Sequence, residues 1–222
     1  YLYEVSGNFV KGWDVPKSDN DIVSKIYHFR VEGKDYLVYA DRYRLYILDR
    51  KGKERVKVST LLNLSANTSL YLKMAFMDAN GEIVLVNFRG QVERIKGEEM
   101  IGGGMFNVED VNNDGQDEFI YTLKNRIVVM DNKGKLLFEK HWEDSELDFP
   151  YIYRFSARDS RIGIMDGKGE RLFLLDMKEV SKGFPIRGNS PFSIAFGDNG
   201  SAGFYLFAGS DGTHLLKYRV LR

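Results

Sequence analysis

Oxygen-bearing side chains stand at alternate positions in the segment 110–118, in the order in which calcium-binding loops present them. Counting from the first acid, positions 1, 3, 5 and 9 carry such side chains, position 6 is glycine, and position 7 offers its backbone carbonyl. Calcium is a hard cation that takes about six to eight oxygen ligands, and the glycine allows the sharp turn that wraps one segment around it. We therefore expect a Ca²⁺ site whose ligands come from Asp110, Asn112, Asp114, Gln116 and Glu118.

An ordinary turn is the alternative explanation of the same residues, because Asn-Asn-Asp-Gly is a favourable turn sequence in which the acids could simply be solvated. Aligning the glycines of similar turns places Gly33, Gly81 and Gly200 opposite Gly115, and those three turns do not carry the full set of acids. The backbone turn therefore forms without them, and an ion is the economical reason for gathering them in one loop. Acids crowded around a short loop repel one another, so the expected role of calcium is to stiffen a hairpin.

A short block of sequence recurs along the chain and predicts a strand, a tight turn and a second strand. Residues 45–53 align with residues 127–135: four apolar residues, Asp, two polar residues, Gly and Lys occur in the same order. Weaker copies lie at 2–7, 92–97 and 172–176. Glycine supplies the positive φ that such a turn requires.

A second recurring element precedes these blocks, a nearly continuous apolar run that follows a turn. It occurs at 36–40, 83–86, 119–121, 162–165 and 204–208. Because successive residues are apolar, both faces of the strand should be buried, as in an inner strand that lies between two neighbouring sheets. A unit of roughly 42 residues with four strands and little helix, written about five times, predicts an all-β chain folded as a β-propeller of four-stranded antiparallel blades.

We place the blades in a single domain, 1–222, near residues 22–60, 69–101, 104–142, 150–187 and 190–222. Residues 1–15 should supply closing strands, because 11–15 resemble 182–186 at the end of another blade and pairing the termini would remove open sheet edges. Residues 2–5 and 213–221 both read as third strands, which leaves one strand surplus. Two interpretations stay open: the extra strand is tolerated, or the chain is a piece of a longer propeller whose earlier blades lie upstream.

The segment 110–118 resembles the calcium loops of FG-GAP and VCBS-like propeller repeats, in which such a loop joins two strands of one blade. Position 12 is Tyr121, so the closing Glu and the exiting helix of an EF-hand are absent. The blade pattern loosely resembles quinoprotein-like and WD40-like propellers over most of the chain. These resemblances imply a propeller with one structural calcium loop.

Other candidate catalytic groups are better explained as structural or solvated. His28, His141 and His214 are far apart in the sequence and show no metal-ligand spacing. An acidic run could in principle hydrolyse glycosidic bonds, although a solvated loop between two blades explains it better; it comprises Glu143, Asp144, Glu146 and Asp148. Aromatic side chains at loop ends could form a binding rim for proteins or sugars; these are Tyr43, Trp142, Tyr151 and Tyr153.

Composition narrows the classes of partner. The 222 residues include 32 Lys and Arg against 32 Asp and Glu, and this balance argues against nucleic acid, which favours an excess of basic residues. No apolar run approaches the roughly 20 residues of a membrane-spanning helix. The chain has no Cys, which excludes disulfides and fits a periplasmic, cell-surface or secreted location, where an unpaired thiol is a liability.

These observations favour a non-catalytic propeller that binds a protein or carbohydrate ligand on one face, or serves as a scaffold. The alternative is a propeller enzyme, a hydrolase, lyase or quinoprotein-type dehydrogenase, that acts at the central face. A strongly repeated sequence without a catalytic signature supports the first interpretation, and the loose blade resemblance permits the second.

Overall fold

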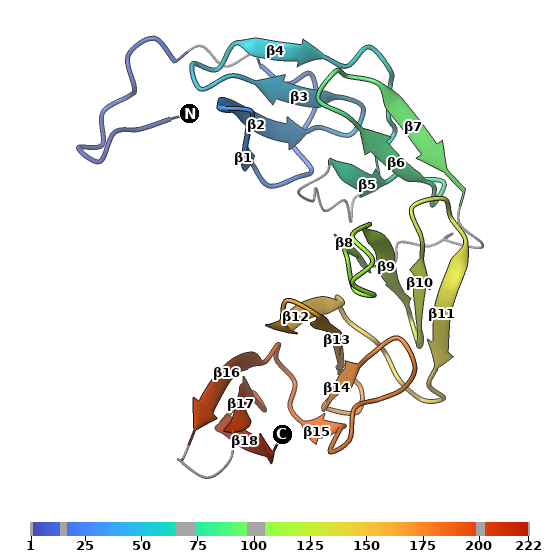
Figure 1. Ribbon diagram of the computed structural model, residues 1–222. Coiled ribbons are helices and arrows are strands. Elements are labelled where there is room, and N and C mark those ends of the chain that lie inside the picture. Colours follow the sequence, from blue (N-terminus) through green and yellow to red (C-terminus); the bar gives the residue numbers. More distant parts are fainter. Residues whose placement is uncertain (1, 14–16, 65–73, 97–104, 199–202, 222) are drawn as a thin grey trace. The chain divides into compact units, whose positions relative to one another are not determined.

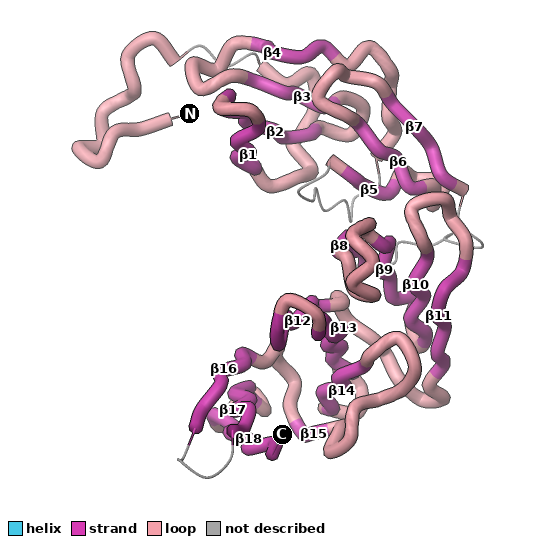
Figure 2. Tube along the Cα trace, in the orientation of Figure 1, coloured by secondary structure: helices cyan, strands magenta, loops and turns pink. Residues whose placement is uncertain are grey.

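The computed structural model contains strands and turns. It describes residues 2–13, 17–64, 74–96, 105–198 and 203–221, and none of these residues is helical. The chain divides into two compact units, Tyr1–Gly103 and Gly104–Arg222, which are considered separately below (Figures 1 and 2). The strands form five antiparallel sheets of three or four strands, so the prediction of an all-β chain with about five blades is confirmed.

The first unit holds two sheets. One sheet has the order β1-β2-β3-β4, and its strands are β1 (Tyr27–Val31), β2 (Lys34–Ala40), β3 (Leu45–Leu48) and β4 (Glu54–Lys57). The other has the order β5-β6-β7, with β5 (Ala75–Met77), β6 (Ile83–Val86) and β7 (Val92–Ile95). Each strand pairs with the one that follows it in sequence, so each sheet is a meander.

The second unit holds three sheets, again with neighbouring strands consecutive in sequence. The first contains β8 (Met105–Glu109), β9 (Glu118–Leu123), β10 (Arg126–Met130) and β11 (Leu136–His141). The second contains β12 (Tyr151–Ser156), β13 (Asp159–Asp166), β14 (Arg171–Leu175) and β15 (Ile186–Arg187). The third contains β16 (Ser193–Asp198), β17 (Gly203–Ser210) and β18 (Leu215–Leu221).

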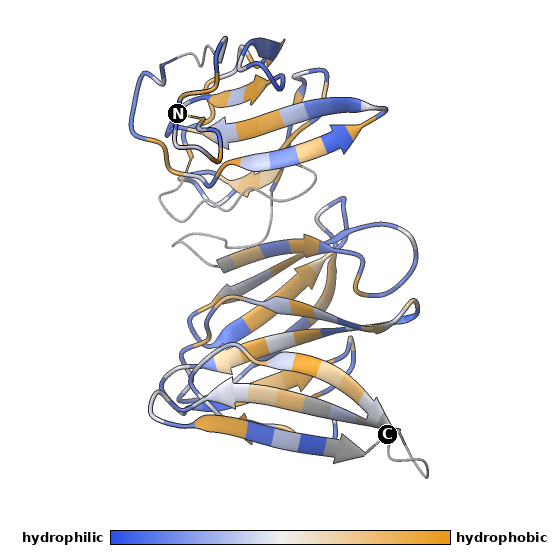
Figure 3. Cartoon of the chain, turned by 90° about the vertical axis from the view of Figure 1, so that its left-hand side faces the viewer, coloured by the Kyte–Doolittle hydropathy of each residue, from blue (hydrophilic) through white to orange (hydrophobic). Residues whose placement is uncertain are grey.

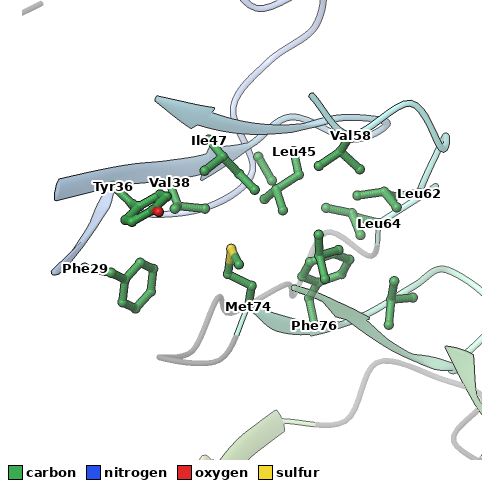
Figure 4. Packing of buried hydrophobic residues seen from close by; sticks show 13 residues of the cluster. Phe29, Tyr36, Val38, Leu45, Ile47, Val58, Leu62, Leu64, Met74 and Phe76 are labelled. Carbon is green, nitrogen blue, oxygen red and sulfur yellow. The ribbon is translucent and has the colours of Figure 1, made fainter. Parts of the chain in front are cut away.

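The apolar runs form inner strands, and most of their described residues are buried, although Leu37, Leu85 and Met165 are only partly buried. Every residue of β3 is buried, as are the described apolar residues at the centres of β9 and β13. Side chains from β1, β2 and β3 interdigitate with those around β5, including Phe29, Val38 and Phe76 (Figure 4). Within each unit, apolar residues concentrate in the strands and hydrophilic residues in the turns (Figure 3).

The recurring sequence block forms one turn with the same hydrogen bonds in three sheets. In the turn after β3, the Asp49 N–H donates to Lys53 O at 2.8 Å and the Gly52 N–H donates to Asp49 O at 3.0 Å. Asn87 after β6 and Asp131 after β10 repeat both bonds. In each case the side-chain oxygen of the first residue also accepts two backbone N–H groups from its own turn.

The predicted alignment of Gly81 with Gly33 and Gly115 is wrong. Gly33 and Gly115 lie between the first and second strands of four-stranded sheets, whereas Gly81 joins β5 to β6. The buried Asp78 that ends β5 bridges Leu64, as Asp166 at the end of the second strand β13 bridges Leu147, so β5 corresponds to a second strand and Gly81 lies between second and third strands. The error arose because glycine turns occur at both places. Gly200 and its neighbour Asn199 lie outside the described residues.

The segments that connect successive sheets are bonded in a repeated way. The Leu64 N–H donates to Arg42 O in the turn after β2, and Leu64 forms a β-bridge with Asp78 at the end of β5. Leu147 does the same in the second unit, with Lys124 O and Asp166. Each connector thus ties a turn of one sheet to the next sheet. The single domain, its blade boundaries and closure by residues 1–15 stay predictions.

Gly90 offers a test of how closely the two sheets of the first unit approach each other. It has a φ of 79°, and a Cβ placed there would lie 2.6 Å from Lys57 O and 3.1 Å from a methyl carbon of Val56. Gly33 has a similar φ of 74° with nothing within 4 Å of such a Cβ. Both Ala variants carry left-handed strain of about 1–2 kcal/mol; we expect Gly90→Ala to lose about 1–3 kcal/mol more.

Urea unfolding of the two variants measures this difference. Equal losses for Gly90→Ala and Gly33→Ala would contradict the close backbone approach.

Candidate functional site

The predicted calcium loop joins β8 to β9. Glu109 pairs with Glu118 at the end of the ladder, so the residues between them form the loop. Val111 is 3% exposed and packs in the core of the second unit, which fixes the loop near its start. The five predicted ligands therefore lie together at one end of a well-anchored hairpin.

Two of the acids satisfy backbone N–H groups of the turn. Asp110 accepts hydrogen bonds from the N–H of Asp114 at 3.2 Å and of Gly115 at 3.1 Å, one on each carboxylate oxygen. Asp114 in turn accepts the Gln116 N–H at 2.8 Å. These bonds fold the loop back on itself, so the carboxylates have a structural role whether or not an ion binds.

Asn112 lies between two carboxylates. Its amide nitrogen donates to Glu118 Oε1 at 3.0 Å and to Asp114 Oδ2 at 3.2 Å, while its oxygen accepts the Asp114 N–H. The partial positive charge of the amide N–H₂ thus bridges two negative groups. A bound cation would have to take over that position between the carboxylates.

Glu118 is a buried acid in an unfavourable electrostatic setting. It is 1% exposed. Burial raises the pKa of Glu118, the negative charges of Asp114 and Asp110 raise it further, and hydrogen bonds from the N–H groups of Val111 and Asn112 only partly offset these effects. The loop therefore concentrates negative charge at a poorly solvated place, which favours a cation.

The donor set fits calcium in chemistry, since all of the candidate ligands are oxygens. The Gln116 side chain, however, accepts a hydrogen bond from Asn132 in the turn after β10 at 2.7 Å, which leaves its backbone carbonyl as the candidate ligand. Within the described part of the chain, no three acidic or histidine side chains converge on a metal-sized position in this conformation. Calcium binding stays a prediction.

Buried aspartates at the ends of second strands were missed by the sequence analysis. Asp41, Asp78 and Asp166 are 0%, 2% and 0% exposed, and each follows an apolar run directly. Arg94 contacts the Asp78 carboxylate at 2.5 Å, and the Arg171 guanidinium contacts Asp166 through two nitrogens at 2.6 and 3.1 Å. The signal was present in the sequence as an apolar dipeptide followed by Asp in three repeats.

Hydrogen bonds stabilise the charged form of Asp41. Burial is the largest single influence and would raise the pKa of Asp41, but the N–H groups of Tyr43 and Arg44 and the hydroxyl of Tyr46 together hold this pKa below its usual range. Asp166 follows the same logic: the N–H of Glu146 and the Arg171 guanidinium outweigh burial and lower its pKa. These carboxylates are structural anchors of their turns.

The three histidines lie on the surface, and each is within ion-pair distance of one carboxylate. Their partners are Asp35 for His28, Glu139 for His141 and Asp211 for His214, at 3.0, 2.9 and 3.4 Å. All three side chains are more than half exposed. The structural interpretation of the histidines is consistent with these contacts.

The acidic run and the aromatic candidates serve several roles. The Glu146 N–H donates to the Asp166 carboxylate, and the Asp148 N–H donates to Met165 O. Asp144 is exposed near Lys168.

Trp142 and Tyr153 pack in the cores of the second unit, against Phe173 and Phe192 respectively, so they do not form an exposed rim. Tyr43 is 39% exposed and Tyr151 is half-buried.

A cavity of about 440 Å³ lies beside the outer strand of the first sheet. Its lining comes from β3, β4 and the segment that follows β4, and includes Arg44, Tyr46, Glu54, Lys57 and Thr60. The stretch 50–57, which comprises the turn after β3 and the strand β4, presents five exposed basic side chains and one acidic one. The structure thus places a positively charged turn and strand next to a cavity, which the sequence analysis had not singled out.

No protein-family model and no curated protein matches the chain. Solved structures do: BBS1N in complex with ARL6DN, in crystals soaked with mercury and with lead, matches at TM-scores of 0.56 in both cases and 10% and 11% identity. The matches cover 89% and 96% of this chain, which spans 64% and 68% of the BBS1N chains. A catalytically inactive virginiamycin B lyase from Staphylococcus aureus with quinupristin matches at 0.51, with 13% identity, over 91% of this chain and 71% of that one.

The fold is a β-propeller. Five antiparallel meanders and the likeness to these structures show this together, and at such low identities the likeness shows the fold alone. None of the described segments is a helix long and apolar enough to cross a membrane.

Asp41 and Asp49 provide a matched test of the buried carboxylates. We expect Asp41→Asn to destabilise the protein by about 1–3 kcal/mol, because an amide places N–H donors against donors of the turn. Asp49→Asn should be nearly neutral, since Asn87 already makes the same turn in the next sheet. Urea unfolding at neutral pH measures both, and equal losses would contradict the role of Asp41.

The pH dependence gives an independent check. The folded-state pKa of Asp41 lies below the unfolded value of about 3.9. Its stabilising effect is therefore complete above that value and is lost as the pH falls through the folded-state pKa. The difference in unfolding free energy between wild type and Asp41→Asn should shrink from pH 6 toward pH 3, and a constant difference would count against it.

Proposed function

We propose that this chain is a non-catalytic β-propeller module that binds an acidic, extended segment of a partner protein along β4, with one hairpin stabilised by calcium. The observation that carries the proposal is the basic stretch 50–57 beside the cavity. The chain as a whole has zero net charge, whereas the stretch 50–57 has five basic residues against one acid, all exposed. Such a local excess attracts an acidic ligand and raises its association rate.

The position of β4 suits an extended peptide. β4 is the last strand in the order β1-β2-β3-β4, and in the described part of the chain it pairs only with β3. An edge strand offers backbone N–H and C=O groups to a further strand, while pockets beside it hold alternate side chains. The cavity next to Lys57 and Thr60 would hold such side chains.

The comparison with BBS1N supports protein binding as the kind of function. Those structures contain the propeller in complex with ARL6DN, so a propeller of this likeness can carry a protein partner. The carboxylates of the buried residues Asp41, Asp78 and Asp166 accept hydrogen bonds from their own turns or from arginine side chains, which supports a structural role for them.

An enzyme is the second candidate. The likeness to virginiamycin B lyase is the observation behind this second candidate, although at 13% identity it shows the fold and not the activity.

A periplasmic, cell-surface or secreted location belongs to the main proposal, because weak calcium sites are filled at extracellular concentrations.

Charge reversal tests the proposed groove. A ten-residue peptide of alternating Glu and Val, labelled for fluorescence anisotropy, is a suitable probe. We expect the double variant Lys53→Glu with Lys57→Glu to weaken its binding at least about tenfold, because two attractions become repulsions. The matched control, Lys133→Glu with Lys135→Glu, alters the equivalent turn of the second unit and should leave affinity unchanged. Equal effects of both pairs would contradict binding at β4.

Thermal unfolding with and without calcium tests the loop. Bound ligand stabilises by RT ln(1 + [L]/Kd), about 2.7 kcal/mol at a concentration one hundred times the Kd, which raises Tm by several degrees. We expect this increment in the wild type and in Asp49→Ala, which weakens the equivalent turn of the first unit. Asp114→Ala should abolish it. A wild-type Tm that is the same in calcium and in chelator would favour the plain turn.

A further inference from the structure

The N-terminal segment 2–13 forms a two-stranded ribbon that copies the outer half of another sheet. Within it the Glu4 N–H donates to Asn8 O at 2.8 Å and the Val10 N–H donates to Leu2 O at 3.0 Å, while Tyr3 and Phe9 form a β-bridge. After the ribbon the Trp13 N–H donates to Val10 O at 3.2 Å.

The same bonds occur between β14 and the residues leading to β15. The Asp176 N–H donates to Glu179 O at 3.1 Å and the Ser181 N–H donates to Leu174 O at 2.7 Å, while Leu175 and Val180 form the bridge. The Phe184 N–H then donates to Ser181 O at 3.1 Å.

Sequence and backbone conformation agree with this match. Lys11-Gly12-Trp13 corresponds to Lys182-Gly183-Phe184, and both glycines have positive φ, 80° and 88°. Residues 2–13 therefore match the third strand, the turn and the approach to the fourth strand of a blade. Residues 14–16 lie outside the described residues.

The segments that follow the two ribbons match as well. The Val23 N–H donates to Ala40 O and the Ala40 N–H donates to Ser24 Oγ, at 3.0 and 2.8 Å. Asn189, Ser190 and Ser210 make the same two bonds, both at 2.8 Å. The sheet β1–β4 thus follows the N-terminal ribbon as the sheet β16–β18 follows β14 and β15.

This match extends to the side chains of the following sheet. Counting back from Ala40 and Ser210, Leu37 corresponds to Phe207, and their cross-strand partners are Leu48 and Tyr218. Phe207 and Tyr218 pack in the cluster that includes Leu172 and Leu174 of β14. Leu37 and Leu48 belong to a second apolar cluster of the first sheet, separate from the one shared with β5. That sheet therefore has an apolar cluster at the position where the sheet β16–β18 packs against β14.

The ribbon lacks the inner strands that its counterpart has. β14 pairs on its inner side with β13, and there Leu174 and Leu175 are 1% and 0% exposed. The equivalent residues Leu2 and Tyr3 are 39% and 53% exposed, and β-pairing of residues 2–5 within the described chain is confined to the bridge with Phe9. Leu2 O and the Glu4 N–H bond across the ribbon. Since the backbone polar groups of successive residues in a strand point to opposite sides, the N–H and C=O of Tyr3 point away from the ribbon, as in an unpaired edge strand.

We infer that residues 2–13 are the outer half of a further blade, whose two inner strands come from a segment of the same polypeptide that precedes Tyr1. A counterpart of β12 and β13 would pair with Leu2–Glu4, accept the Tyr3 N–H and cover Leu2. The order of elements supports a preceding segment, because inner strands come before outer strands in both complete four-stranded meanders of the second unit. The sheet β16–β18 already has a third strand, so this ribbon would duplicate rather than complete it.

The experiment compares residues 1–222 with the natural polypeptide extended upstream by about 25 residues, enough for a pair of strands such as β12 and β13. Amide hydrogen exchange is measured at Tyr3. We expect the Tyr3 amide to exchange on the order of 100-fold more slowly in the extended protein, because it gains a strand partner. The inference is overturned if the exchange rate is unchanged or if the upstream reading frame encodes no pair of strands. It is also overturned if the protection depends on protein concentration, because pairing with a second copy would give that dependence.

A matched pair of variants gives a second readout. Leu2→Asp should lower the Tm of the extended protein by at least about 5 °C, because the position becomes buried, and should shift that of residues 1–222 by less than about 1 °C. Asn8→Asp should be neutral in both, since Glu179 occupies the equivalent exposed position. Equal shifts for Leu2→Asp in the two lengths count against the inference, and the amide measurement on wild type stands if the variant fails to fold.

Discussion

The constraint on which the rest of this structure depends is that the inner strands are apolar on both faces. Val38, Ile47 and Ile164 have no measurable exposure, and each belongs to a strand whose sheet packs against another sheet of its unit. A single meander of this kind cannot bury both faces by itself. Sheets must therefore be stacked on sheets, and polar groups are confined to strand ends, turns and outer strands.

Strand ends bring their own difficulty, because backbone N–H groups of the turns must be satisfied beside a dry interior. Aspartate solves this locally: Asp41 and Asp49 each accept two N–H groups of their own turn. Asp110 uses the same chemistry. The loop 110–118 differs only in gathering further acids, with Glu118 buried against Asn112, and this surplus of negative charge is what distinguishes a possible ion site from an ordinary turn.

Much of the fold could be predicted from the sequence because short, local residue patterns determine its turns and inner strands. The block around Asp49 and Asp131 encodes a specific turn, and apolar runs encode inner strands. The alignment of Gly81 failed because positive φ is needed at two kinds of turn, and glycine alone does not tell them apart. Trp142 and Tyr153 were placed on a rim because their positions at strand ends are visible in sequence, whereas the contacts with Phe173 and Phe192 that bury them depend on tertiary packing.

Core packing constrains the outer strands of the sheets least, because most of their side chains are exposed. Their composition is therefore more informative about binding than that of the inner strands. β4 has only one half-buried residue, Val56, and its other side chains are exposed. The turn after β3 and the strand β4 together carry five basic residues. The equivalent turn of the second unit has two, Lys133 and Lys135, and β11 begins with exposed Leu136 and Leu137. Because packing requires neither pattern, the difference between them reflects something other than the fold. A basic edge beside a cavity is accordingly a stronger pointer to a ligand than any of the buried acids, whose partners lie within the chain.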